Sequence, residues 1–206
     1  MKFGLPRKIS PVFPPCILWP TLLTRTVQKF ERTRATKRII CWVNTVLFRP
    51  LKEDVTIVPV GGADKIATFI SLMRGNELST VCLLDTFTDQ SAQARLKRMV
   101  EQKIIADKKI LFYHTVIGQA YADIEDLFNK DEYLALYNGA FGKSVQLSDL
   151  SLDQPIMTQL KRLNGNKAFN HYAPANYMAK NIGALAFSEE TLQRFENLFR
   201  LINKKI

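Results

Sequence analysis

The sequence contains few of the residues that build zinc sites, disulfide frameworks or histidine-centred active sites. It has three cysteines and two histidines among 206 residues. Cys16, Cys41 and Cys82 show no CxxC or Cys/His spacing, and an odd number of cysteines cannot pair completely within one chain. Zinc and a disulfide framework are therefore not expected, and a reducing cytoplasm fits this cysteine usage best. Cys82 lies in an apolar run and is expected to act as a small buried hydrophobe.

The sequence also lacks a long uninterrupted hydrophobic run, because no apolar stretch approaches the roughly 20 residues that a membrane-spanning helix needs. The N-terminal stretch resembles a signal peptide in having basic residues before an apolar segment, but prolines interrupt it. These are Pro6, Pro11, Pro14, Pro15 and Pro20. Proline breaks the helix that the apolar region of a signal peptide forms, and no small-residue cleavage site follows before Arg25. The sequence predicts neither a secretion signal nor a membrane partner.

Acidic residues are nearly absent from the first quarter of the chain. The whole chain carries a net charge of +10, with 47% hydrophobic and 23% charged residues, a composition typical of a soluble globular protein. Residues 1–53 hold 11 of the 29 Lys and Arg but only two acids (11 − 2 = +9), and the remainder carries +1. Residues 1–50 are interpreted as a basic, poorly ordered extension, and a DNA-binding arm is the alternative.

From residue 54 onward the apolar residues follow the periods of strands and helices, so residues 54–206 are expected to form one α/β domain. Strands are predicted at 55–60, 80–84 and 110–113, and helices at 63–73, 91–105, 133–141, 156–163 and 191–202. This alternation predicts a parallel sheet with helices on both faces. The C-terminal third is predicted to be largely helical, with Ser188 as the N-cap of a last helix whose apolar face packs on the sheet.

Acidic residues follow the second and third predicted strands. Asp85 ends the second strand, Asp89 lies four residues later, and Asp123, Glu125 and Asp126 follow the third strand. The carboxyl ends of parallel strands meet at one edge of a sheet, and carboxylate oxygens there can bind a hard divalent cation. Clustered carboxylates repel one another unless a cation neutralises them. The alternative is that these acids cap helices or are solvated, Asp89 for example as an N-cap.

Four segments, in this order, resemble the Toprim domain of the overcoming-lysogenisation-defect (OLD) family of ATP-dependent endonucleases. They are VPVGGADK (58–65), LLDTFTD (83–89), ADIEDLF (122–128) and FNHYAPA (169–175). The resemblance extends over about three quarters of the chain. It implies a Toprim-like parallel sheet and Mg²⁺- or Mn²⁺-dependent hydrolysis of DNA phosphodiester bonds, in the setting of phage defence or DNA processing.

The resemblance also assigns roles to individual residues. Asp85 stands at the first position of the family's DxD motif, and Glu125 stands at the glutamate that follows the next strand. The implied metal ligands are Asp85, Asp89, Asp123 and Glu125, and the implied catalytic residues are Asp85, Glu125 and Lys180. The second acid of a strict DxD would be residue 87, which is Phe87, and Asp89 stands in for it. A solvated side chain is the alternative for Lys180.

A Toprim domain begins with a strand that ends in a Glu-Gly pair, and no such segment precedes Val55. The chain is therefore expected to be an N-terminally truncated Toprim domain with impaired activity and without the family's ATPase domain. DNA is the expected partner, and the resemblance allows a separate ATPase domain or subunit and a homodimer.

Two further interpretations stay open. One is a catalytically inactive core that serves as an interaction module, and the other is a basic nucleic-acid-binding protein that acts through residues 25–49. His114 and His171 lack the sequence context of a catalytic pair, although histidine titrates near neutral pH. His171 is expected to be a structural hydrogen-bonding residue.

Overall fold

The computed structural model describes residues 27–47, 50–60, 63–76, 78–86, 90–151, 154–167, 170–181 and 184–206. Strands and helices alternate in the first half of this part, and the second half is helical. In chain order the elements are α1 (Val27–Val46), α2 (Ala63–Gly75), β1 (Cys82–Leu84), α3 (Gln90–Glu101), η1 (Asp107–Lys109), β2 (Ile110–Phe112), α4 (Tyr113–Ile117), η2 (Ile124–Leu127), α5 (Lys130–Phe141), η3 (Leu147–Asp149), α6 (Ile156–Leu163), α7 (Tyr172–Lys180) and α8 (Glu189–Lys205).

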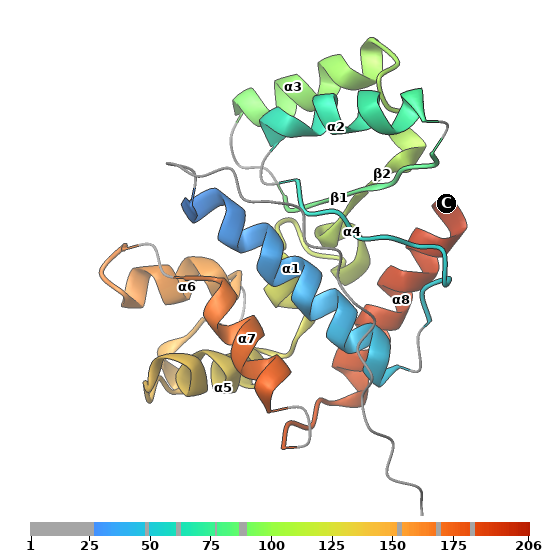
Figure 1. Cartoon of the computed structure of the whole chain (residues 1–206). Coiled ribbons are helices and arrows are strands. Elements are labelled where there is room, and N and C mark those ends of the chain that lie inside the picture. Colours follow the sequence, from blue (N-terminus) through green and yellow to red (C-terminus); the bar gives the residue numbers. More distant parts are fainter. Residues whose placement is uncertain are drawn as a thin grey trace, which may run out of the picture.

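β1 and β2 form a parallel sheet in which Cys82 pairs with Ile110 and Leu84 with Phe112. The helix between them, α3, lies with α2 over one face of the sheet, and α1, α4 and α8 lie on the other side (Figure 1). This is the helical crossover that parallel strands require. The predicted α/β class, with a parallel sheet between helices, is confirmed. The sheet has two strands in the described residues instead of the predicted three.

The side chains of the two strands alternate between two hydrophobic clusters, one on each face of the sheet. Leu83 and Leu111 contact the larger cluster. Leu84 and Ile110, one residue away in each strand, belong to the smaller cluster together with Ile66 of α2. Successive side chains of a strand point to opposite faces, so strands that are apolar at every position suit a sheet that is covered on both faces.

The larger hydrophobic cluster holds the helices of the second half together. Its fully buried side chains include Tyr113, Tyr133, Leu160, Met178 and Phe195, which come from α4, α5, α6, α7 and α8. Full burial of one large apolar side chain stabilises a fold by roughly 1.5–3 kcal/mol. This cluster is therefore the main source of stability, and the sheet lies at its border.

Residues 27–46 form a helix, whereas the sequence predicts that residues 1–50 pack poorly. Ala35, Ile39 and Val43 of α1 are at most 2% exposed and belong to the larger cluster. Their spacing of four residues places them on one helix face. Arg38 lies over the ring of Tyr172 at 5.2 Å from its centroid and donates a hydrogen bond to its hydroxyl, which fixes α1 against α7.

The expectation of poor packing is corrected for this helix, because aliphatic residues between the bases give α1 an apolar face. The core consequently includes residues on the N-terminal side of the predicted domain boundary at residue 54. Residues 1–26 lie outside the described part of the chain.

The strand predicted at 55–60 is not formed. Val55 and Ile57 pack on the larger cluster and Val60 on the smaller one, as the alternating side chains of a strand would. Pro59 has no N–H to donate to a neighbouring strand, so a continuous ladder is disfavoured here. The segment is therefore wrongly predicted as a strand but contributes apolar side chains to both clusters.

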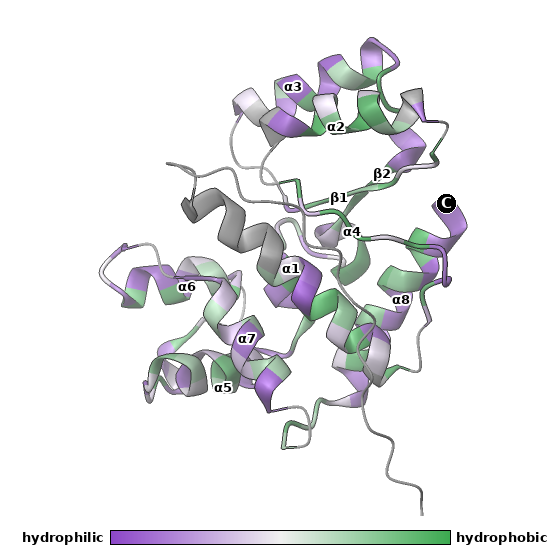
Figure 2. Cartoon of the chain, in the orientation of Figure 1, coloured by the Kyte–Doolittle hydropathy of each residue, from purple (hydrophilic) through white to green (hydrophobic). Residues whose placement is uncertain are grey.

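The helices α5, α6 and α8 begin and end close to the predicted positions, whereas the sequence pattern gives no bounds for α7. α6 spans the predicted residues 156–163, and Ser188 caps α8 by accepting a hydrogen bond of 3.3 Å from the backbone N of Thr191. The apolar face of α8 contacts α4 and η2 and belongs to the larger cluster, which also includes Leu111 of β2. α8 carries hydrophilic and hydrophobic residues along its length (Figure 2). None of the described helices combines the length and apolar character of a membrane span.

α3 ends four residues earlier than predicted, at Glu101. Lys103 has a φ of 54°, in the left-handed region that ends a right-handed helix. Ile105 lies in the connection between α3 and β2, and it is nevertheless buried in the smaller cluster. An apolar residue at the expected spacing thus lies beyond the helix end.

Candidate functional site

The predicted site lies where β1 ends. Asp85 directly follows β1 and is half-buried. β2 is followed at once by the short helix α4, whose C-cap residue Gly118 has a φ of 77°, a backbone conformation that glycine adopts most easily. After this turn the chain passes the end of β1 again, and Asp123 precedes η2 there.

Thr86 joins these two parts of the chain. Its backbone N donates to the carbonyl of Ala122 at 3.2 Å, and the backbone N of Ala122 donates to the Thr86 hydroxyl at 3.1 Å. The same hydroxyl lies 2.8 Å from Nδ1 of His114 on α4. Asp85 and Asp123 are each one residue from this bonded pair, and consecutive Cα atoms lie about 3.8 Å apart. Their backbones are therefore held near each other at the carboxyl edge of the sheet.

Asp126 organises the backbone beside this edge. Its Oδ2 accepts from the backbone N of Asp123 at 2.9 Å, and its Oδ1 accepts from the backbone N of Ile156 at 2.9 Å. The first bond closes η2, and the second satisfies an N–H at the start of α6. Burial raises the pKa of Asp126, and the two backbone bonds oppose this shift. Asp126 is thus a structural acid that links η2 to α6.

Glu125 points toward α7. It is 1% exposed, and its Oε1 lies 3.4 Å from Nδ1 of His171, whose side chain is 24% exposed. His171 immediately precedes α7, next to the Tyr172 that contacts Arg38. The structure therefore places a carboxylate and an imidazole together at the border of the larger cluster. The prediction that His171 is a structural hydrogen-bonding residue agrees with this contact.

Lys180 lies at the opposite end of α7 from His171 and is exposed. The eight residue steps from Tyr172 to Lys180 correspond to about 12 Å of helix. The structure therefore brings Lys180 to the solvent at the far end of α7, and His171 is the α7-side group that lies beside Glu125.

Asp89, the fourth predicted metal ligand, lies outside the described residues. Among the residues that the structure describes, no group of three or more His, Cys, Asp or Glu side chains is assembled to hold a metal ion. The loops that carry Asp85 and Asp123 are brought together, whereas Glu125 contacts His171. That Asp85 and Glu125 share one cation stays a prediction.

The sequence interpretation does not identify Thr86 or His114 as part of this edge. A threonine after a strand has no distinctive sequence pattern, and its role depends on a partner 36 residues away at Ala122. His114 follows β2 by two residues and stacks on Phe112 with ring centroids 5.1 Å apart. Its position after a strand is the one signal that places it at the same edge as Asp85.

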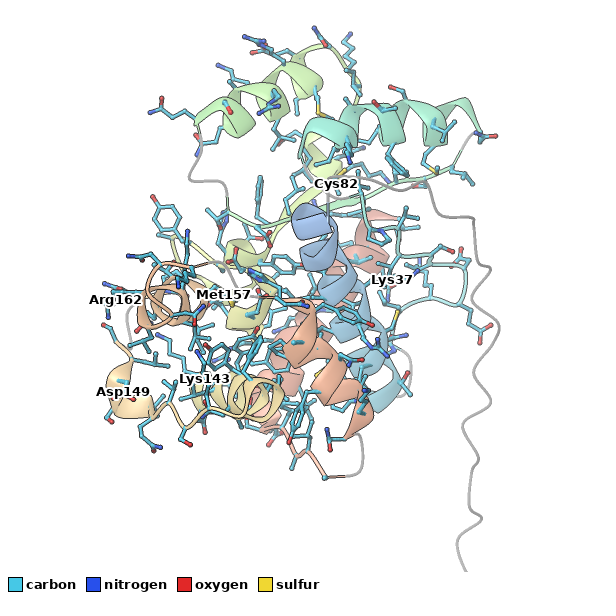
Figure 3. The ribbon with its side chains drawn as sticks, turned by 60° about the vertical axis from the view of Figure 1, so that its left-hand side comes forward. Lys37, Cys82, Lys143, Asp149, Met157 and Arg162 are labelled. Atoms are coloured by element: carbon cyan, nitrogen blue, oxygen red, sulfur yellow. The ribbon has the colours of Figure 1, made fainter. Side chains whose placement is uncertain are left out.

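A separate cleft of about 400 Å³ lies between α1 and the segment that follows it. It is lined by Lys37, Cys41, Asn44, Leu51, Lys52, Glu53, Val55 and Ile57. Figure 3 labels Lys37 on α1 and shows it apart from Arg162 and Lys143. Asn44 accepts from the backbone N of Leu51 at 2.9 Å, so one polar group of the cleft already holds the turn after α1. None of the acids at the carboxyl edge lines it.

Comparison with known proteins gives no relatives: no family model matches this sequence, and no curated protein or solved structure is detectably similar to it.

Proposed function

We propose that this chain is a metal-dependent DNA endonuclease module, with Mg²⁺ or Mn²⁺ as its cofactor, and that its core corresponds to the Toprim domain of the OLD family. The observation that supports this most directly is the bonded pair of Thr86 and Ala122, since it holds the acids Asp85 and Asp123 near each other at the carboxyl edge of a parallel sheet. Binding sites of open α/β sheets are formed at this edge.

The donor set of this edge suits a magnesium ion. Mg²⁺ is commonly held by one or two carboxylates together with waters and substrate phosphate oxygens. Asp85 and Asp123 are two half-buried carboxylates on adjoining loops. An Mg²⁺ or Mn²⁺ ion bound to them would polarise a phosphodiester and lower the pKa of a bound water.

The other residues of the edge would serve this site by holding it in place. Thr86 fixes the loop after β1 to the chain before η2, and Asp126 fixes η2 to α6. Glu125, the third acid in this proposal, is held by His171 at 3.4 Å. Fixed ligand loops reduce the cost of assembling a metal site when substrate binds.

A catalytically inactive core that acts as an interaction module is the second candidate, and one observation favours it. Glu125 is buried and faces an imidazole, and no group of three ligating side chains is assembled in the described residues. Two carboxylates bind a divalent cation more weakly than three. On either candidate, the isolated chain is expected to bind Mg²⁺ or Mn²⁺ weakly.

A nicking assay on supercoiled plasmid distinguishes the two candidates. We expect slow nicking by the purified chain in Mn²⁺, and we expect Asp85→Asn to abolish it because a metal ligand is lost. Asp107→Asn is the matched control: Asp107 is exposed and lies just before β2, at the amino edge of the same sheet. This control should nick as the unchanged chain does.

The possible results of this assay distinguish the nuclease from the inactive core. Nicking that both variants retain would not depend on Asp85 and would reject it as a catalytic metal ligand. A chain that does not nick at all, at millimolar Mn²⁺, would support the inactive core.

A further inference from the structure

The exposed face of α3 carries an ordered row of polar and basic side chains. Ser91, Arg95 and Arg98 of α3, and Gln102 directly after its end, are all exposed and follow one another at intervals of four, three and four residues. The backbone N of Gln102 donates to the carbonyl of Arg98 at 2.8 Å, so Gln102 continues the last helical turn. Residues at this spacing lie on one face of a helix. We call these four residues the α3 row. Figure 2 shows α3 as largely hydrophilic, whereas α2 beside it is more hydrophobic.

The orientation of the α3 row is fixed by the opposite face of the helix. Met99 is buried in the smaller cluster, and Leu96 and Val100 pack against it. α3 also packs along α2. The row therefore faces away from the sheet and cannot turn inward without breaking the smaller cluster.

The charges of α3 are arranged so that the positive charge is concentrated on the row. The one acid in the α3 sequence, Glu101, lies 3.9 Å from Lys97, and neither residue belongs to the row. Arg95 donates from Nε to the carbonyl of Ser91 at 3.3 Å and from Nη2 to its hydroxyl at 3.1 Å. These bonds hold the guanidinium of Arg95 over the first turn of α3.

The row leads to the carboxyl edge of the sheet, because α3 is the first helix after β1 and Asp85. The 11 residue steps from Ser91 to Gln102 correspond to about 16 Å of helix. One strand of B-DNA carries a phosphate about every 3.4 Å along the axis. A row of this length can therefore face several consecutive phosphates of one strand.

We propose that the phosphodiester backbone of DNA lies along the α3 row, with Arg95 and Arg98 contacting phosphates. This inference rests on the proposed function, because it assigns the path by which DNA reaches the edge at Asp85. Contacts of this kind position a nucleic acid without reading its sequence. We choose DNA as the partner because the positive charge of the row complements the negative charge of a polyanion.

A second basic surface provides a matched control. Lys161 and Arg162, in the last turn of α6, are exposed and carry the same charge as Arg95 and Arg98. Figure 3 shows Arg162 near Lys143, in a part of the molecule away from Cys82 of β1. Removing the α6 pair lowers the net charge of the chain equally but leaves the α3 row intact.

The test measures binding of the full chain to a fluorescent DNA duplex without divalent metal, across a range of salt concentrations. We expect the double variant Arg95→Gln and Arg98→Gln to bind at least about tenfold more weakly at low salt and to lower the slope of log affinity against log salt by about 2, since two phosphate contacts are lost. Lys161→Gln with Arg162→Gln should bind as the unchanged chain does. Arg95→Lys with Arg98→Lys should retain most of the affinity.

Equal weakening by the α3 and α6 variants would overturn the proposal, because the effect would then follow net charge and not the row. Unchanged binding by the α3 variant would also overturn it, as would a chain that binds anionic lipid vesicles but no DNA. Circular dichroism of each variant verifies that the chain keeps its helix content. Metal-free binding also separates this inference from catalysis. If the chain binds DNA along α3 but never nicks plasmid, the nuclease proposal is rejected and the proposed DNA path along α3 is still supported.

Discussion

Two adjacent acids, Glu125 and Asp126, show how much the role of a carboxylate depends on its neighbours. Both are buried, at 1% and 9% exposure. Asp126 accepts from two backbone N–H groups, whereas Glu125 lies beside the imidazole of His171. The sequence places both in one acidic cluster, but only their surroundings divide them into a structural acid and a candidate site residue.

The titration of Asp126 gives a prediction with a definite sign. Burial raises its pKa above the value of 3.8 that an unfolded chain would show, so its titration contributes stability that is fully present below about pH 3.8 and is lost as the pH rises through the raised pKa. Asp126→Asn cannot titrate and places an amide donor against a backbone N–H. We expect it to destabilise the fold by about 1–3 kcal/mol at neutral pH.

The deficit of Asp126→Asn relative to the unchanged chain should grow as the pH falls toward 4, because only the unchanged chain gains stability from protonation of this carboxyl group. Urea unfolding at a series of pH values measures it, with Asp131→Asn, an exposed acid on α5, as control. A deficit that shrinks at low pH would mean that the pKa of Asp126 is lowered in the folded state.

Among the helices, α5 and α8 are tied together at their N-termini by Glu132. Its carboxylate accepts from the backbone N of Asn129 at 3.1 Å, and it also accepts from the backbone N of Ser188 and the hydroxyl of Thr191. A carboxylate near the first turn of a helix also interacts favourably with the helix dipole. One side chain therefore satisfies donors at the starts of two helices that are far apart in sequence.

We predict that Glu132→Gln destabilises the fold by about 2–3 kcal/mol, because the amide nitrogen of Gln can accept none of these bonds and a donor in the core loses its partner. Thermal unfolding measures the effect. Glu189→Gln is the control, since Glu189 is an exposed acid in the first turn of α8. Equal shifts for both variants would show that only helix charge matters.

The elements most predictable from sequence are those with a complete local signal. α6 and α8 have an amphipathic period, and α8 has a capping serine, so their positions follow from neighbouring residues. The segment at 55–60 has strand-like apolar residues, yet a strand also needs hydrogen bonds to an adjacent strand, and Pro59 has no N–H to donate. α1 is missed because its bases obscure an apolar face that distant parts of the chain cover, among them α7 and Phe187.

For the whole molecule, α1 is part of the core and not an appendage. We predict that Ile39→Ala destabilises the fold by about 2–5 kcal/mol, as expected for a large buried side chain that leaves a cavity. Thr45→Ala, on the exposed side of the same helix, should change stability by less than about 0.5 kcal/mol. Chemical denaturation of both variants provides the measurement, and similar values would indicate that α1 does not pack on α7.

The candidate site is predictable only where a local sequence signal exists. The position of Asp85 follows from β1 and the rule that sites form at the carboxyl ends of strands. The pairing of Thr86 with Ala122 and the contact of Glu125 with His171 both join residues more than 30 positions apart. Such contacts depend on how the helices pack, so a pattern of neighbouring residues carries no signal for them.

The packing of α1 on α7 has a consequence for synthesis on the ribosome. Arg38 and Tyr172 are 134 residues apart in sequence, so α1 leaves the ribosome long before its partner exists. At about 5–20 residues per second, this delay is roughly 7–27 s. During that time the apolar face of α1, which includes Ile39 and Val43, lacks the part of its native cover that α7 provides. Nascent chains are therefore expected to need protection by a chaperone until α7 has emerged, and α1 is the segment that such a chaperone would bind.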